Sequence, residues 1–163
     1  MGTEIDRITD QLERDHSGDA WHGSPVTAIL DGITAAQAAA RPIAAGHSIW
    51  EIVLHMTGWK QEVRRRLSGA PAGEPEAGDW PGTGEPTADR WRAALDRLDA
   101  AHAELLAAVR VLPESRLAEP TNDPRNRELG TGVTRYVLLH GLVQHDAYHA
   151  GQIAVLKRAL TTR

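Results

Sequence analysis

The sequence contains no cysteine and no phenylalanine, although its 163 residues include five tryptophans and eight histidines. Without cysteine there is no disulfide framework, no thiolate ligand for a metal and no cysteine nucleophile. A metal would have to be held by histidine, aspartate or glutamate, and thiol chemistry would need a thiol supplied from outside the chain. The absence of cysteine fits the reducing cytoplasm, where we expect this protein to be located.

The sequence also lacks an excess of positive charge and any long apolar run. Its 18 Lys and Arg residues are outnumbered by 22 Asp and Glu residues, which gives a net charge of −4 at pH 7. A protein that binds nucleic acid by neutralising phosphates carries the opposite balance. No stretch approaches the roughly 18–20 apolar residues of a membrane span, and the charged N-terminus does not resemble a signal peptide. We therefore expect no nucleic-acid partner and no membrane partner.

Helical periodicity dominates the chain, and the alternation typical of strands is missing. We expect residues 1–163 to form one domain of the all-α class, a four-helix bundle. The expected helical segments are 3–33, which Gly18 and Gly23 interrupt, a short turn at 34–37, and long helices over 48–67, 87–112 and 134–159. Whether the first segment is one kinked helix or two is left open.

Two irregular connections separate the last three helices, over residues 68–86 and 119–132. Both are longer than neighbouring antiparallel helices need. At least one sequential pair of helices could therefore be parallel and joined by a crossover. The longer connection, 68–86, is the better candidate.

The last helix carries the sequence His145-Asp146-Ala147-Tyr148-His149. Residues four apart lie about 40° apart around a helix, so both imidazoles project from one face. This is the spacing with which one helix supplies two metal ligands. Asp146 stands where a zincin metalloprotease has glutamate, which argues against that class of enzyme and favours a solvated or hydrogen-bonded acid.

A third ligand is expected from another helix, and periodicity alone does not identify it. His55 lies at the flank of the apolar stripe of helix 48–67. His102 lies in the apolar seam of helix 87–112, which favours it slightly. Either residue could instead be a core histidine whose ring nitrogens are satisfied by hydrogen bonds.

The segment from Ser48 to Met56, SIWEIVLHM, followed far downstream by HDAYHAGQI at 145–153, resembles the DinB-like (YfiT-like) metalloenzyme family. The resemblance covers essentially the whole chain. It implies a four-helix bundle of up-down-down-up topology, a homodimer, and a divalent metal ion, zinc or nickel, held by three histidines. Matched residue by residue, those ligands are His55, His145 and His149.

The resemblance also implies what such a site does. Characterised relatives include transferases and isomerases that use a low-molecular-weight thiol, so the expected function is that of a metal-dependent enzyme acting on a small molecule with a thiol cosubstrate, or a hydrolase. Three imidazoles leave a coordination position open, as in catalytic sites. The alternative is a non-catalytic, stress-associated dimeric bundle whose metal site is structural or vestigial.

Four further residues are candidates for the surroundings of the site. Gln152 lies three residues after His149 on the same face and could orient a ligand. Glu51 lies one turn before His55, although the Ser48–Glu51 spacing is also that of a capping box. Trp59 and Tyr148 could line the mouth of a pocket or serve as core or interface aromatics.

Overall fold

The structure is a computed structural model that describes residues 2–123 and 133–161. Its helices are α1 (Glu4–His16), α2 (Val26–Leu30), α3 (Ala35–Ala39), α4 (Ile49–Leu67), α5 (Ala88–Arg110), the short 3-10 helix η1 (Glu114–Arg116) and α7 (Arg135–Thr161). No strand occurs in the described ranges, so the predicted all-α class is confirmed. The second half of the irregular segment predicted over 119–132 lies outside the described residues.

Hydrogen-bonding side chains fix where the helices begin. Ser48 accepts a hydrogen bond from the amide of Glu51, whose carboxylate accepts one from the Ser48 amide in return. This capping box satisfies amides that have no partner within the helix. Thr3 and Thr34 build the same arrangement at α1 and α3. The first helical segment is two separate helices, because residues 17–25 leave the helical conformation between α1 and α2.

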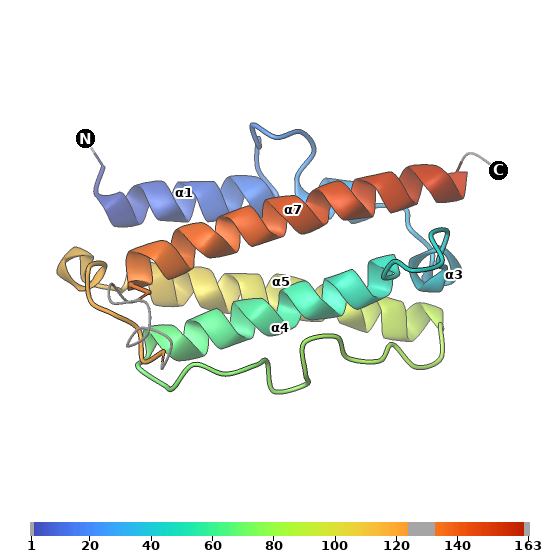
Figure 1. The fold of residues 1–163 in the computed structure, drawn as a ribbon. Helices are drawn as coiled ribbons and strands as arrows, with labels where there is room; N and C mark the ends of the chain where they lie inside the picture. The colour runs from blue at the N-terminus through green and yellow to red at the C-terminus, as the bar shows by residue number, and fades with distance from the viewer. Residues whose placement is uncertain (1, 124–132, 162–163) are drawn as a thin grey trace.

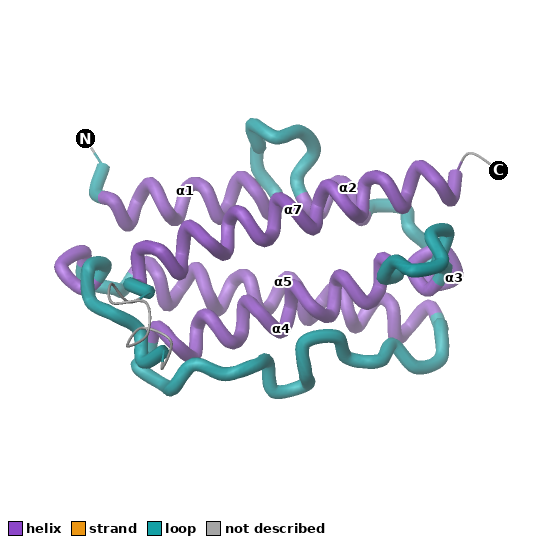
Figure 2. Tube along the Cα trace, in the orientation of Figure 1, coloured by secondary structure: helices purple, strands orange, loops and turns teal. Residues whose placement is uncertain are grey.

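The four long helices lie side by side, with α4 packed against both α5 and α7, and α1 packed against α5 and α7. In Figure 1 the chain runs from left to right through α1 and α7, and from right to left through α4 and α5. The sequential helices α4 and α5 are therefore parallel. Residues 68–87, which we call the crossover, join them by returning along the length of the bundle beside α4 (Figure 2).

The apolar core has two parts with a polar layer between them. One part surrounds Trp50 and Trp91, and the other surrounds Leu12 and Leu105. Each long helix contributes a buried polar side chain to the layer between them: His16 from α1, Lys60 from α4, His102 from α5 and Asp146 from α7. Buried polar groups are costly unless they are paired, so this layer is where a functional site is to be sought.

None of the helices in residues 2–123 and 133–161 combines the length and the apolar character that crossing a lipid bilayer requires.

Candidate metal centre

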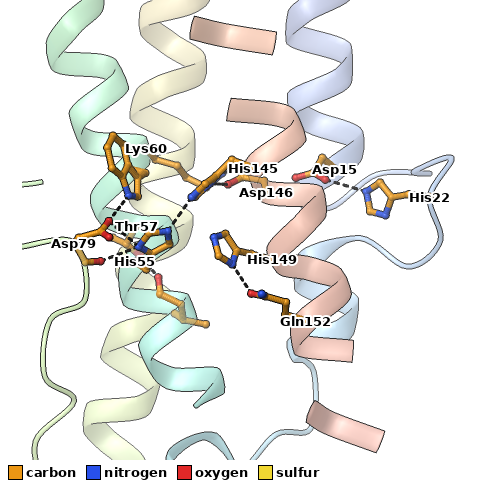
Figure 3. A network of polar contacts seen from close by, with 12 residues as sticks. Asp15, His22, His55, Thr57, Lys60, Asp79, His145, Asp146, His149 and Gln152 are labelled. Carbon is orange, nitrogen blue, oxygen red and sulfur yellow. Dashed lines mark hydrogen bonds and ion pairs between the residues drawn. The ribbon is translucent and has the colours of Figure 1, made fainter. Parts of the chain in front are cut away.

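Three histidines from two helices converge at one edge of the polar layer. His55 comes from α4, and His145 and His149 come from successive turns of α7 (Figure 3). Their ring centroids lie 4.4 to 4.9 Å apart. One ring nitrogen of each histidine lies within 4.8 Å of those of the other two. We call these residues the triad; they are the three residues that the family resemblance implied as metal ligands.

Each triad histidine has an acceptor at its Nδ1 atom. His55 Nδ1 lies 2.7 Å from the main-chain oxygen of Asp79, and His149 Nδ1 lies 2.7 Å from Gln152 Oε1. His145 Nδ1 lies 3.3 Å from Asp146 Oδ1. A carbonyl or carboxylate oxygen only accepts, so each Nδ1 donates a proton and each neutral ring keeps its lone pair on Nε2.

The donor set fits a divalent metal ion. Nε2 of His55 lies 2.9 Å from Nε2 of His145, so the two lone pairs face one another. A cation between them converts this repulsion into attraction. Neutral imidazole with its other nitrogen held by an acceptor is the usual form of a histidine that binds zinc, nickel or copper. His55, His145 and His149 are therefore the residues that would hold the ion.

The surroundings favour the neutral form of two triad histidines, His55 and His149. Burial lowers the pKa of His55, and the neighbouring His145 acts in the same direction. Burial also lowers the pKa of His149 to about 4. Metal binding requires deprotonated ligands, so these two imidazoles are ready to bind at neutral pH without first losing a proton.

Behind His145, a buried ion pair connects α7 to α4. Lys60 Nζ contacts Asp146 Oδ2, and both side chains are only 1% exposed. Burial by itself raises the pKa of Asp146, but Lys60 and His145 more than offset it and hold that pKa below its usual value. Asp146 is therefore a carboxylate that accepts from Lys60 on one oxygen and from His145 on the other.

Aromatic rings of α4 and the crossover cover the triad. Trp80 stacks on His55 with centroids 4.0 Å apart, and its ring also stacks on His47 at 3.5 Å. Trp59 approaches His55 and His145 edge-on, both at 6.3 Å. Trp59 Nε1 donates to Asp79 Oδ1 at 2.8 Å, which ties the crossover to α4 beside the site.

The structure places some of the residues predicted around the site beside the triad and one at the start of α4. Gln152 hydrogen-bonds a triad histidine, and Tyr148 is 65% exposed with its ring 5.2 Å from that of His149. Glu51 does not reach the triad, and this prediction needs correction. Its carboxylate caps α4 and pairs with Arg41, so the capping interpretation holds for this residue.

His102, the alternative that periodicity favoured, lies elsewhere in the polar layer. Its ring stacks on that of His16 with centroids 3.9 Å apart, which joins α5 to α1. Burial lowers the pKa of His102 to about 3, and Lys60 acts in the same direction. The apolar seam identified a buried histidine correctly, but the ring of His102 lies against His16 of α1 and away from the triad.

Sequence reasoning missed three contributors to the site. Nothing in the sequence indicates that Lys60 is buried, because a lysine inside a helix is normally exposed. Asp79 contributes its main-chain oxygen, which no residue type reveals. Asp146 was expected to be a solvated or hydrogen-bonded acid; it is hydrogen-bonded, but its burial beside Lys60 of another helix was not predicted.

Comparisons with known proteins identify the fold and the family of the chain. A crystal structure of a conserved protein from Enterococcus faecalis superposes with a TM-score of 0.73 over 100% of both chains, at 18% sequence identity, which shows a shared fold. No curated protein matches the sequence. The family model of the DinB superfamily matches residues 20–153, a span that includes all three triad histidines. The chain belongs to the DinB superfamily.

Proposed function

We propose that this protein is a divalent-metal-dependent enzyme whose ion is held by His55, His145 and His149. The observation that carries the proposal is the shared orientation of the three rings, each with Nδ1 paired to an oxygen and Nε2 turned toward the others. Zinc and nickel are the ions that the family resemblance implies, and both accept neutral imidazole. A bound ion of this kind supplies a Lewis acid that favours the deprotonated form of a water or thiol ligand.

The protein's own residues would hold that chemistry in place. Asp79, Asp146 and Gln152 fix the three Nδ1 protons, so the rings cannot rotate without losing a hydrogen bond. Trp80 and Trp59 shield His55 from water. Partial exclusion of water strengthens electrostatic interactions at the site.

The reaction that we propose is transfer to a low-molecular-weight thiol, with hydrolysis as the second candidate. In the transfer, the thiol sulfur forms a bond to an electrophilic carbon, the leaving group departs with its bonding electrons, and the thiol proton passes to water. The chain has no cysteine of its own. The sulfur would therefore belong to a cosubstrate, as the family resemblance implies.

Metal content tests the first part of this proposal. The protein should be purified without a histidine tag, reconstituted with zinc or nickel, and analysed for bound metal per chain. We expect about one ion per chain in the wild type, and a large loss in His149→Ala, which removes one of only three ligands. Wild-type metal content far below one per chain after reconstitution would refute the metal centre.

Turnover separates an enzyme from a non-catalytic bundle. A panel of cellular thiols should be incubated with electrophiles and the metal-loaded protein, in the wild type and in His149→Ala. We expect turnover only in the wild type, with circular dichroism showing that both proteins are folded. Equal rates in the two folded proteins would favour the non-catalytic alternative.

We also propose that the chain forms a homodimer, as the resemblance implies. Trp21, in the loop that projects from the bundle between α1 and α2 (Figure 1), is fully exposed. Large exposed apolar side chains are often covered by a partner. Light scattering should give twice the mass of one chain, and a monomer mass at all concentrations would contradict the proposal.

A further inference from the structure

A cleft of about 560 Å³ lies beside the triad, between α7 and the segment that precedes α4. The side chains that matter for its character are Ile43, His47, Tyr148, Gln152 and Val155, and Gly151 also lines it. Its volume falls within the range of small-molecule sites in proteins. Nothing described so far uses this space.

The wall of the cleft carries no charged residue. No Asp, Glu, Lys or Arg is among its lining residues, although such residues make up 25% of the chain. Its apolar members Ile43, Tyr148 and Val155 are 50%, 65% and 59% exposed. A charged group placed here would meet no opposite charge among the lining residues, whereas an apolar group would gain contacts with several apolar side chains.

Two paths of direct contact join the cleft to the triad. Gln152 lines the cleft and accepts the hydrogen bond of His149. His47 also lines it and stacks on Trp80, which stacks on His55. A second cleft, of about 450 Å³ between residues 27–35 and 88–99, includes charged residues and touches none of these groups.

We propose that this cleft binds the uncharged, apolar part of a substrate whose reactive group lies at the triad. The inference rests on the proposed metal centre and names the class of substrate for it: a small molecule with an aromatic or branched aliphatic body. Low-molecular-weight thiols of cells are strongly polar. The cleft therefore takes the apolar cosubstrate, and the thiol approaches from elsewhere.

Two glycines of α7 provide a matched pair of variants. A side chain at Gly151 would project into the cleft, and one at Gly141 would lie on α7 far from it; a Cβ at either position meets no atom within 4 Å. Leucine favours helix over glycine by about the same amount at both positions. Gly151→Leu and Gly141→Leu should therefore both fold, and only the first should fill the cleft.

Binding of the uncharged fluorescent probe N-phenylnaphthylamine to the metal-free protein tests the inference. We expect saturable fluorescence enhancement in the wild type, and about tenfold or greater loss of affinity in Gly151→Leu, because the leucine occupies the space of the probe. Gly141→Leu should bind like the wild type. Equal affinity in all three proteins, or no saturable binding in the wild type, would overturn the proposal.

Two further measurements on the same samples keep the outcomes distinct. Metal analysis tests the metal centre separately, because a protein that binds no metal would still give the same probe titration in its metal-free form. Light scattering identifies a competing occupant. If the wild type binds no probe and forms a dimer that Gly151→Leu dissociates while Gly141→Leu does not, a second copy covers the cleft and the substrate proposal is wrong.

Discussion

At the scale of single residues, the triad is defined as much by its oxygen acceptors as by its histidines. Each acceptor is of a different kind: a main-chain carbonyl at Asp79, a carboxylate at Asp146 and a side-chain amide at Gln152. Partners of this type fix the tautomer and the orientation of a ligating histidine. Their removal should therefore weaken metal binding without removing a ligand.

Gln152 offers the most direct test of this idea. Gln152→Leu removes the acceptor of His149, and we expect about a 10–100-fold loss of metal affinity. Gln152→Glu keeps an oxygen at the same place and should retain most of the affinity. Competition with a chromogenic chelator measures both. Equal affinities for Leu and Glu would show that the hydrogen bond does not orient His149.

The pair of Lys60 and Asp146 should be more important for stability than for metal chemistry. Lys60→Met leaves a fully buried carboxylate without its cation, and we expect a loss of about 3–5 kcal/mol in the free energy of unfolding. The double variant Lys60→Met/Asp146→Leu removes both charges and should recover much of this loss. Urea denaturation at pH 7 measures the difference. A loss below about 1 kcal/mol in the single variant would mean that water replaces the lysine.

At the scale of helices and connections, the crossover is held against α4 by a close approach. A Cβ atom added to Gly58 would lie 2.9 Å from Cβ of Pro75, closer than such atoms normally come. The same crossover supplies Asp79 and Trp80 to the triad. The absence of a side chain at Gly58 therefore allows Pro75 to lie against α4. Asp79, four residues further along the crossover, is thereby held beside His55.

We expect Gly58→Ala to move the crossover away from α4. Alanine favours helix over glycine by about 1 kcal/mol, but the overlap with Pro75 should cost about 1–3 kcal/mol, so the variant should not gain the usual stability. Gly141→Ala, with open space around its Cβ, should be stabilised. Thermal unfolding compares them, and a change in tryptophan fluorescence, to which Trp80 contributes as one of five tryptophans, gives a second measurement. Equal stabilisation of both variants would contradict the prediction.

The contact of α1 with α5 should make stability depend on pH. Burial lowers the pKa of His102 to about 3 in the folded protein, against about 6.5 for an exposed histidine, so protons bind the unfolded chain first as the pH falls. The contribution of neutral His102 to the free energy of unfolding is complete above pH 6.5. It declines below that pH, by about 3 kcal/mol between pH 7 and pH 4. Lys60, His16, Asp146 and Arg110 are the charged or titratable groups that act on this ring.

A variant isolates this effect from its neighbours. Burial raises the pKa of Asp15 to about 6, so Asp15 acts in the opposite sense and loses stabilisation as the pH rises through 6. His102→Leu keeps Asp15 and removes the imidazole. Urea unfolding of both proteins from pH 7 to pH 4 should show the wild type losing more stability than the variant. Parallel curves would exclude His102 as the cause.

Local signals predicted the elements well and their tertiary neighbours poorly. The Ser48–Glu51 capping box placed the start of α4, and the length of 68–86 indicated the parallel pair of helices. The choice of His55 as the proposed third ligand followed from resemblance only. Periodicity places both His55 and His102 on buried faces, and it does not tell which neighbouring helix each face meets.

At the scale of the whole molecule, the polar layer divides the apolar core into two parts that the triad could connect. His55 belongs to α4, and His145 and His149 belong to α7. An ion bound by all three would join these helices at the level where apolar packing is interrupted. Binding to the folded state alone would stabilise the whole bundle.

Thermal unfolding with and without metal measures this link. At a free zinc concentration of 100 times the dissociation constant, we expect about 2.7 kcal/mol of added stability in the wild type, seen as a higher Tm. His149→Ala should show little or no shift at the same zinc concentration. The same shift in both proteins would mean that zinc binds elsewhere.

The hydrogen bond from His55 to the main chain at Asp79 has a consequence for how such a site is inherited. Every residue type offers a carbonyl oxygen, so no single substitution at position 79 deletes this acceptor. The path of the crossover holds it in place, and many different sequences can follow that path. During divergence the connection could exchange most of its residues and still present an oxygen to the histidine. In distant relatives this part of the centre would be recognised by the course of the backbone.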